Sequence, residues 1–135
     1  MESSSPGSSS TPLLTSAELA QKHLEFAQKM LEKGDVRRAV KYFEQAAELS
    51  PSEETLYTLA QIELERTDQH NKALEHLKQA VALNQQHTPS WLLLANYWGV
   101  RGQEEKQRRC LEKILAYDPK NRDARDAVEL LITRK

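Results

Sequence analysis

The sequence contains very little cysteine, and its net charge is close to zero. One of its 135 residues is cysteine, Cys110, which excludes a disulfide within the chain and any all-cysteine metal site. The 19 basic residues are balanced by 20 acidic ones, giving a formal charge of −1. Without a general positive field, non-specific nucleic-acid binding loses its main source of free energy. We therefore expect no dedicated nucleic-acid role.

Long apolar runs are also missing. No segment approaches the roughly 18 consecutive apolar residues that a membrane-spanning helix needs. The first residues carry Glu2 and lack the basic region and apolar stretch of a secretory signal. The sequence therefore predicts neither secretion nor membrane insertion, and we expect a cytoplasmic location, which the lone cysteine also fits.

The first 14 residues differ from the rest of the chain. Met1 to Pro12 reads MESSSPGSSSTP, a serine, proline and glycine mixture with too little apolar surface to offset the entropy of ordering it. We predict a disordered tail over residues 1–14, serving as a solubilising or tethering leader. Phosphorylation of its serines is the alternative.

From Thr15 onward, apolar residues recur at three- and four-residue steps, which predicts helices. Thr15 and Glu18 form the T-x-x-E pattern of a capping box. Gly34 and Gly102 each follow one such stretch and precede another, where a helix should end. Three further helix starts are predicted from the dipeptides Ser50-Pro51, Thr88-Pro89 and Asp118-Pro119.

The helical segments repeat with a fixed period. Ala39 and Ala73 are 34 residues apart, and so are Tyr57 and Trp91. A helix-turn-helix unit of 34 residues is the signature of the tetratricopeptide repeat, which the chain resembles. The resemblance implies an all-α solenoid of three helix pairs over residues 20–53, 54–87 and 88–121, with a capping helix over 122–134.

The resemblance also assigns positions within each pair. Large interior positions of the first helices fall on Tyr57 and Trp91, among others, and small residues such as Ala39 and Ala73 face them at the helix crossing. Gln107 departs from the small residue that the family has in the third pair. Members of the family bind other proteins, usually in the concave groove formed by the first helices.

In this register the groove has an apolar stripe with a polar rim. We predict that a partner contacts the following residues: Leu24, Gln28, Leu59, Ile62, Arg66, Leu92, Leu93 and Asn96. One branch of the family clamps a C-terminal carboxylate, and its charged positions correspond here to Leu24, Gln28, Leu59, Pro89 and Leu93. None of these carries a positive charge, so the groove is predicted not to bind acidic chaperone tails.

Residues that could support chemistry are isolated. The four histidines, His23, His70, His76 and His87, form no pair at metal-ligand spacing, and no cofactor or metal is predicted. Cys110 falls where a small packing residue is expected. A basic cluster, Arg101, Lys106, Arg108, Arg109 and Lys113, is interrupted by glutamates and is expected to be a solvated face, with an acidic partner as the alternative.

The sequence thus predicts a non-enzymatic adaptor or scaffold. Its partner would be another protein that offers an apolar peptide or an amphipathic helix to the groove. The alternative is a structural subunit that associates with copies of itself or stacks within a larger assembly, because three repeats leave small terminal faces that are easily extended.

Overall fold

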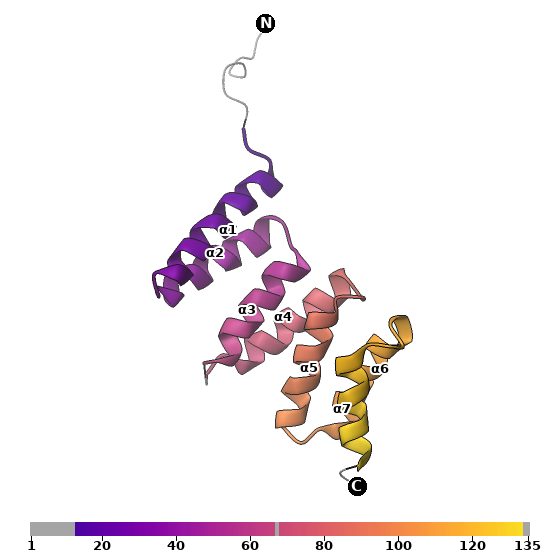
Figure 1. Ribbon diagram of the computed structural model, residues 1–135. Helices are drawn as coiled ribbons and strands as arrows, with labels where there is room; N and C mark the ends of the chain where they lie inside the picture. Colours follow the sequence, from indigo (N-terminus) through magenta and orange to yellow (C-terminus); the bar gives the residue numbers. More distant parts are fainter. Residues whose placement is uncertain (1–12, 67, 134–135) are drawn as a thin grey trace, which may run out of the picture. The chain divides into compact units, whose positions relative to one another are not determined.

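The computed structural model describes residues 13–66 and 68–133, and every regular element within them is an α-helix (Figure 1). In chain order they are α1 (Ser16–Glu32), α2 (Val36–Leu49), α3 (Glu53–Leu64), α4 (His70–Leu83), α5 (Thr88–Val100), α6 (Glu104–Tyr117) and α7 (Arg122–Thr133). The all-α repeat architecture is confirmed. Of the predicted tail, residues 1–12 lie outside the described residues, whereas Leu13 and Leu14 precede α1 without helical structure.

The first helix begins as predicted. The Thr15 hydroxyl accepts a hydrogen bond from the Glu18 amide at 3.1 Å, and the Glu18 carboxylate accepts one from the Thr15 amide at 2.8 Å. Both halves of the capping box are therefore present. The hydrogen bond from the Thr15 amide is the main reason that the pKa of Glu18 lies below its usual value, because it favours the ionised carboxylate.

Two helices end at glycine, as predicted. Gly34 and Gly102 have φ values of 81° and 73°, the left-handed region that favours glycine. After α1, the amides of Gly34 and Asp35 donate to the carbonyls of Leu31 and Met30. The amides of Gly102 and Gln103 repeat this double pattern after α5. Each glycine thus completes a Schellman motif and turns the chain toward the next helix.

The three predicted starts at X-Pro dipeptides are displaced. Ser50 and Asp118 end α2 and α6 instead of starting helices. The cap of α3 is Ser52, whose hydroxyl accepts from the amides of Glu54 and Thr55. At α7 the Asn121 side chain accepts from the amide of Ala124. At α5 the error is one residue, since Thr88 is already helical.

The chain divides into two compact units at Pro51. In the first unit, α1 and α2 pack side by side through small residues and one large ring. Ala20 and Ala27 of α1 are buried, as are Ala39, Phe43 and Ala46 of α2. Small residues on both helices allow the close approach that the repeat pattern predicts.

In the second unit, α3 packs on α4, α5 on α6, and α6 on α7 (Figure 1). Its core is formed by Ala60, Ala73, Leu77, Leu94, Ala95, Cys110, Leu111, Ile114, Ala124 and Leu131. Gln107 fits in this unit because Gly99 lies opposite it on α5. A Cβ atom at Gly99 would come within 2.6 Å of the Gln107 side chain. The missing side chain on α5 therefore compensates for the large residue on α6.

Candidate functional site

A cavity of about 350 Å³ lies between α3 and α5, the first helices of the second and third repeats. Its lining residues are Tyr57, Thr88, Pro89, Leu92, Leu93 and Asn96. Three of the predicted groove residues, Leu92, Leu93 and Asn96, are thus brought together. Within residues 13–66 and 68–133, no charged side chain lines this cavity, so we call it the apolar groove.

The prediction for Leu59 as a groove contact is wrong, because its side chain is 0% exposed. Leu56, Ala60 and Glu63 are buried on the same side of α3. The interior face of this helix therefore begins one residue earlier than the 34-residue register implies. Tyr57, which was predicted to be an interior residue, is half-buried: it packs against the core and also lines the groove.

The cause of this shift lies in the turn between α3 and α4. Gly34 and Gly102 close the corresponding turns of the other two pairs, whereas the segment from Glu65 to Gln69 contains no glycine. The turn spans residues 65–69, whereas the other two turns span only residues 33–35 and 101–103. The longer connection lets the interior face of α3 begin one position earlier while Ala73 and Ala80 keep their places on α4. The lack of a glycine in this turn is the feature of the sequence that could have indicated the shift.

Tyr57 packs against a network of polar side chains. The edge of its ring contacts His87, with ring centroids 5.7 Å apart. The imidazole lies 2.7 Å from the Ser90 hydroxyl and 3.0 Å from the Glu54 carboxylate. His87 and Glu54 thereby connect α3 to the start of α5 and fix one wall of the groove.

Ser90, His87 and Glu54 contact one another in the order of the serine–histidine–carboxylate triad of a hydrolase. The burial of Ser90 argues against that chemistry. Ser90 is 0% exposed, so its hydroxyl cannot reach a substrate. Glu54, at the other end, is largely exposed. The arrangement satisfies the hydrogen-bonding groups of a buried histidine.

The remaining predicted groove residues lie elsewhere. Ile62 is half-buried on α3 and Arg66 is exposed beyond its end; neither lines the apolar groove. In the first unit, Leu24 is half-buried and Gln28 exposed on α1.

The predicted basic cluster is dispersed by contacts with other groups. Arg101 stacks on the Tyr97 ring at 3.6 Å, and Lys106 lies 4.3 Å from the centre of the Trp98 ring. Arg109 forms a long ion pair with Glu105 at 4.0 Å. Lys113 points to a separate cavity, described below. The cluster therefore does not form one surface.

Cys110 is buried, and desolvation raises the pKa of its thiol to about 11. Two histidines are held by hydrogen bonds: His70 lies 3.1 Å from the Leu64 carbonyl, and His76 lies 2.8 Å from the buried carboxylate of Glu63. Across residues 13–66 and 68–133, no three His, Cys, Asp or Glu side chains gather at a spacing that could hold a metal ion. No helix in the same ranges could span a membrane.

Comparison with known proteins identifies the repeat. Residues 31–53 and 53–87 match the family model described as tetratricopeptide repeat. The second match begins at Glu53, in agreement with the register of α3. A curated relative, the STIP1 homolog of Dictyostelium discoideum, is 33% identical over 116 residues. That alignment covers 84% of this chain but only 21% of the relative's length.

Solved structures show the same fold at low identity. The TPR domain of Arabidopsis OM64 has a TM-score of 0.73 at 15% identity, covering 89% of this chain and 99% of that one. The first TPR of Spaghetti (RPAP3), bound to the HSP90 peptide SRMEEVD, has a TM-score of 0.70 at 18% identity, covering 87% and 96%. MamA scores 0.67 at 20% identity, with 78% and 61% covered.

Proposed function

Because the chain is a tetratricopeptide-repeat protein, we propose that it is a non-catalytic adaptor whose apolar groove binds an extended, uncharged segment of a partner protein. Proteins of this family generally mediate protein–protein interaction. The observation that carries the proposal is the lining of the cavity between α3 and α5, where half-buried apolar side chains meet and none of the described lining residues is charged.

The groove offers two kinds of contact. Leu92, Leu93 and the Tyr57 ring provide apolar surface that an incoming side chain would remove from water. The exposed Asn96 amide makes no hydrogen bond within the described residues and is therefore available to a peptide backbone. Apolar contacts together with one amide suit an extended apolar segment.

A matched pair of variants tests this assignment. Leu93→Glu introduces a charge into the groove, whereas Leu83→Glu introduces the same charge at a leucine of α4 that is 51% exposed and outside the groove. Partners captured by the wild-type protein and by Leu83→Glu, but lost with Leu93→Glu, would support the groove. Equal capture by all three would reject it, provided that circular dichroism shows equal helicity.

The relatives raise a second candidate, binding of an acidic chaperone tail. One solved neighbour holds an HSP90 peptide, and the curated relative is a STIP1 homolog. When the position on α3 is moved back by one residue, the positions of the carboxylate clamp are occupied by Leu24, Gln28, Thr58, Pro89 and Leu93. Since none is a lysine or arginine, a terminal carboxylate would lose its hydration without gaining an ion pair.

The peptide SRMEEVD distinguishes the two candidates. A carboxylate clamp requires the free C-terminus, so amidation of the peptide would abolish binding to such a site. We expect the free and amidated peptides to give the same titration with this protein. A clear preference for the free acid would overturn our assignment of an uncharged ligand.

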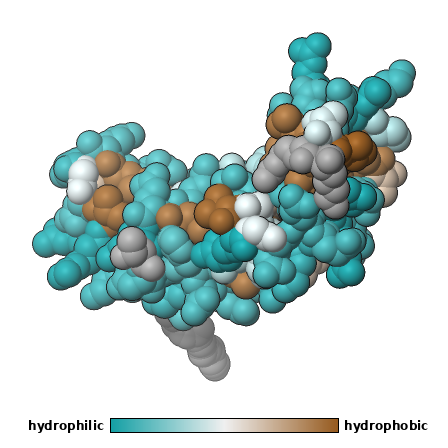
Figure 2. All heavy atoms as spheres, turned by 90° about the horizontal axis from the view of Figure 1, so that it is seen from below, coloured by the Kyte–Doolittle hydropathy of each residue, from teal (hydrophilic) through white to brown (hydrophobic). Residues whose placement is uncertain are grey.

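Self-association remains the alternative, and the exposed end of α7 favours it. Leu130 and Ile132 are 63% and 58% exposed. In the view of Figure 2, hydrophobic atoms form separate patches on a largely hydrophilic face. Sedimentation over a wide concentration range tests this alternative; a monomer throughout argues against it, and dimerisation lost in Leu130→Glu supports it.

A further inference from the structure

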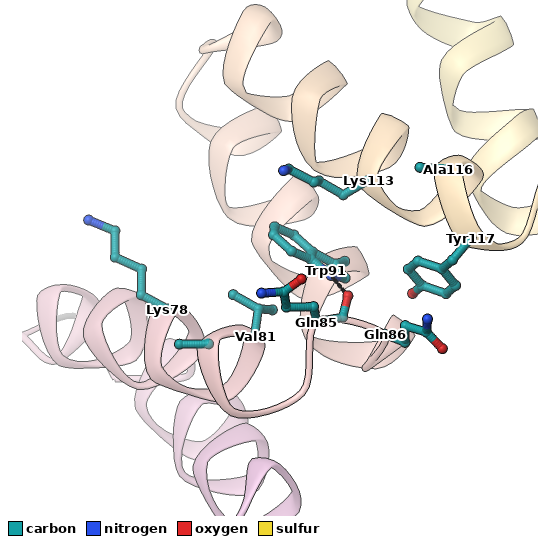
Figure 3. Close-up of a pocket in the computed structure, with 9 residues that line it drawn as sticks. Lys78, Val81, Gln85, Gln86, Trp91, Lys113, Ala116 and Tyr117 are labelled. Atoms are coloured by element: carbon teal, nitrogen blue, oxygen red, sulfur yellow. Dashed lines mark hydrogen bonds between the residues drawn. The ribbon is translucent and has the colours of Figure 1, made fainter.

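A second and larger cavity, of about 480 Å³, lies between α4 and α6 (Figure 3). These are the second helices of their pairs, whereas the apolar groove lies between first helices, and the two cavities share no lining residue. Its floor is Trp91, which reaches it from α5. We call this cavity the outer pocket.

The aromatic walls of the outer pocket are held in place by hydrogen bonds. The Trp91 indole N–H donates to the Gln85 carbonyl at 2.8 Å, which fixes the ring in the turn between α4 and α5. The Tyr117 hydroxyl lies 2.7 Å from that of Thr88. Val81 on α4 and Ala116 on α6 add aliphatic surface. A preorganised aromatic pocket loses little conformational entropy when a ligand side chain enters it.

The charged side chains that line the outer pocket are both positive. Lys78 comes from α4 and Lys113 from α6, and none of the described lining residues is an aspartate or a glutamate. Neither lysine forms an ion pair with any carboxylate of residues 13–66 and 68–133. Figure 3 shows the Lys113 side chain on one side of the Trp91 ring and Gln85 on the other. Two ammonium groups without a carboxylate partner among the described residues therefore stand at the edge of an aromatic surface.

We propose that the outer pocket binds an acidic peptide segment of a partner protein. An apolar or aromatic side chain of the segment packs against Trp91 and Tyr117, and neighbouring carboxylates pair with Lys78 and Lys113. Charge complementarity selects this occupant, since an uncharged segment would leave both lysines unpaired. Two lysines on a chain of net charge −1 are too few for strong nucleic-acid binding, which depends on several phosphate contacts.

Tryptophan fluorescence provides a direct test. The chain has two tryptophans, and Trp98→Phe leaves Trp91 as the only one. The probe is a short synthetic peptide with a phenylalanine flanked by aspartates, amidated at its C-terminus so that no terminal carboxylate contributes. We expect it to shift the Trp91 emission with saturation. The same peptide with asparagines in place of aspartates should bind at least about tenfold more weakly, through the loss of two exposed ion pairs.

Charge-reversal variants locate the site. In the Trp98→Phe background, Lys78→Glu combined with Lys113→Glu should weaken binding of the acidic peptide by at least about tenfold. Lys72→Glu with Lys120→Glu changes the net charge equally at exposed positions outside the pocket and should leave binding unchanged. Leu93→Glu should also leave it unchanged, which separates this site from the apolar groove.

Three outcomes would overturn the proposal. The first is equal affinity for the acidic and the asparagine peptide, and the second is equal loss of binding in both charge-reversal pairs. The third is a Trp91 response to single-stranded polyuridylate but not to the acidic peptide, which would assign the pocket to nucleic acid. Circular dichroism of each variant excludes unfolding as the cause of a lost response.

Discussion

The side-chain hydroxyls of Thr88 and Tyr117 lie 2.7 Å apart, and the two residues line different cavities. Thr88 is at the start of α5 in the apolar groove, whereas Tyr117 ends α6 in the outer pocket. One hydrogen bond thus connects the walls of the two candidate binding sites. It also joins the beginning of one helix to the end of the next within the third repeat.

Removal of this hydrogen bond should cost stability. Thr88→Val keeps the shape but removes the hydroxyl, and we expect a loss of about 1 kcal/mol in the free energy of unfolding, measured by urea denaturation. Thr58→Val is the matched control, since the Thr58 hydroxyl donates only to the Glu54 carbonyl of its own helix. An equal loss of unfolding free energy in both variants would show that the Thr88–Tyr117 hydrogen bond contributes no more to stability than the hydrogen bond of Thr58 within its own helix.

Leu59 and Leu92 should respond differently to truncation. Leu59→Ala creates a cavity in a fully buried site and should destabilise the second unit by about 2 to 5 kcal/mol. Leu92→Ala removes a half-buried side chain from the groove and should cost about 1 kcal/mol, with its main effect on partner binding. Denaturation of both variants checks the register of α3. Similar losses would mean that Leu59 is not an interior residue.

The turn after α5 depends on a glycine. Gly102→Ala should cost about 1 to 2 kcal/mol, because its positive φ brings a Cβ atom too close to the backbone although the surrounding space is open. Gly102→Asn should recover part of this loss, since asparagine tolerates the left-handed region better. Thermal unfolding of the two variants measures the difference. If alanine were as stable as glycine, the Schellman motif would not require glycine here.

Cys110 should be unreactive in the folded protein. Burial raises the pKa of its thiol from 9.0 to about 11, so the thiolate that reacts with alkylating reagents is scarce at neutral pH. Because the folded pKa is the higher one, the thiol's contribution to stability is complete below pH 9 and is lost as the pH rises toward 11. Alkylation followed by mass spectrometry should become fast only in denaturant; rapid labelling of the native chain at pH 7 would contradict the burial.

Cys110→Ser is the companion variant for the pH dependence. A serine does not ionise in this range, so the decline in stability between pH 9 and 11 should be smaller than in the wild-type protein. Both proteins share every other titrating group. The difference between their two pH profiles therefore isolates the thiol.

The sequence by itself determined the architecture, because the signals concerned are local. The Thr15–Glu18 capping box and the two helix-ending glycines act within a few residues of the backbone, and the structure confirms them. The 34-residue period predicted the helix pairs, although on α3 its register was wrong by one residue. The X-Pro helix starts were misplaced by one to three residues. Ser52 and Asn121, short polar residues just after Pro51 and Pro119, compete successfully for the cap position.

Only the tertiary structure decided which side chains face the two cavities. On α3, Leu56 and Tyr57 are both large and apolar, so the pattern alone fits either register; in the structure Leu56 is buried, whereas Tyr57 is half-buried and lines the groove. Likewise, Lys113 belongs by sequence to the local basic cluster, yet it lies across a cavity from Lys78 on another helix. Helix periodicity specifies which residues share a face, whereas the contacts between helices specify what that face meets.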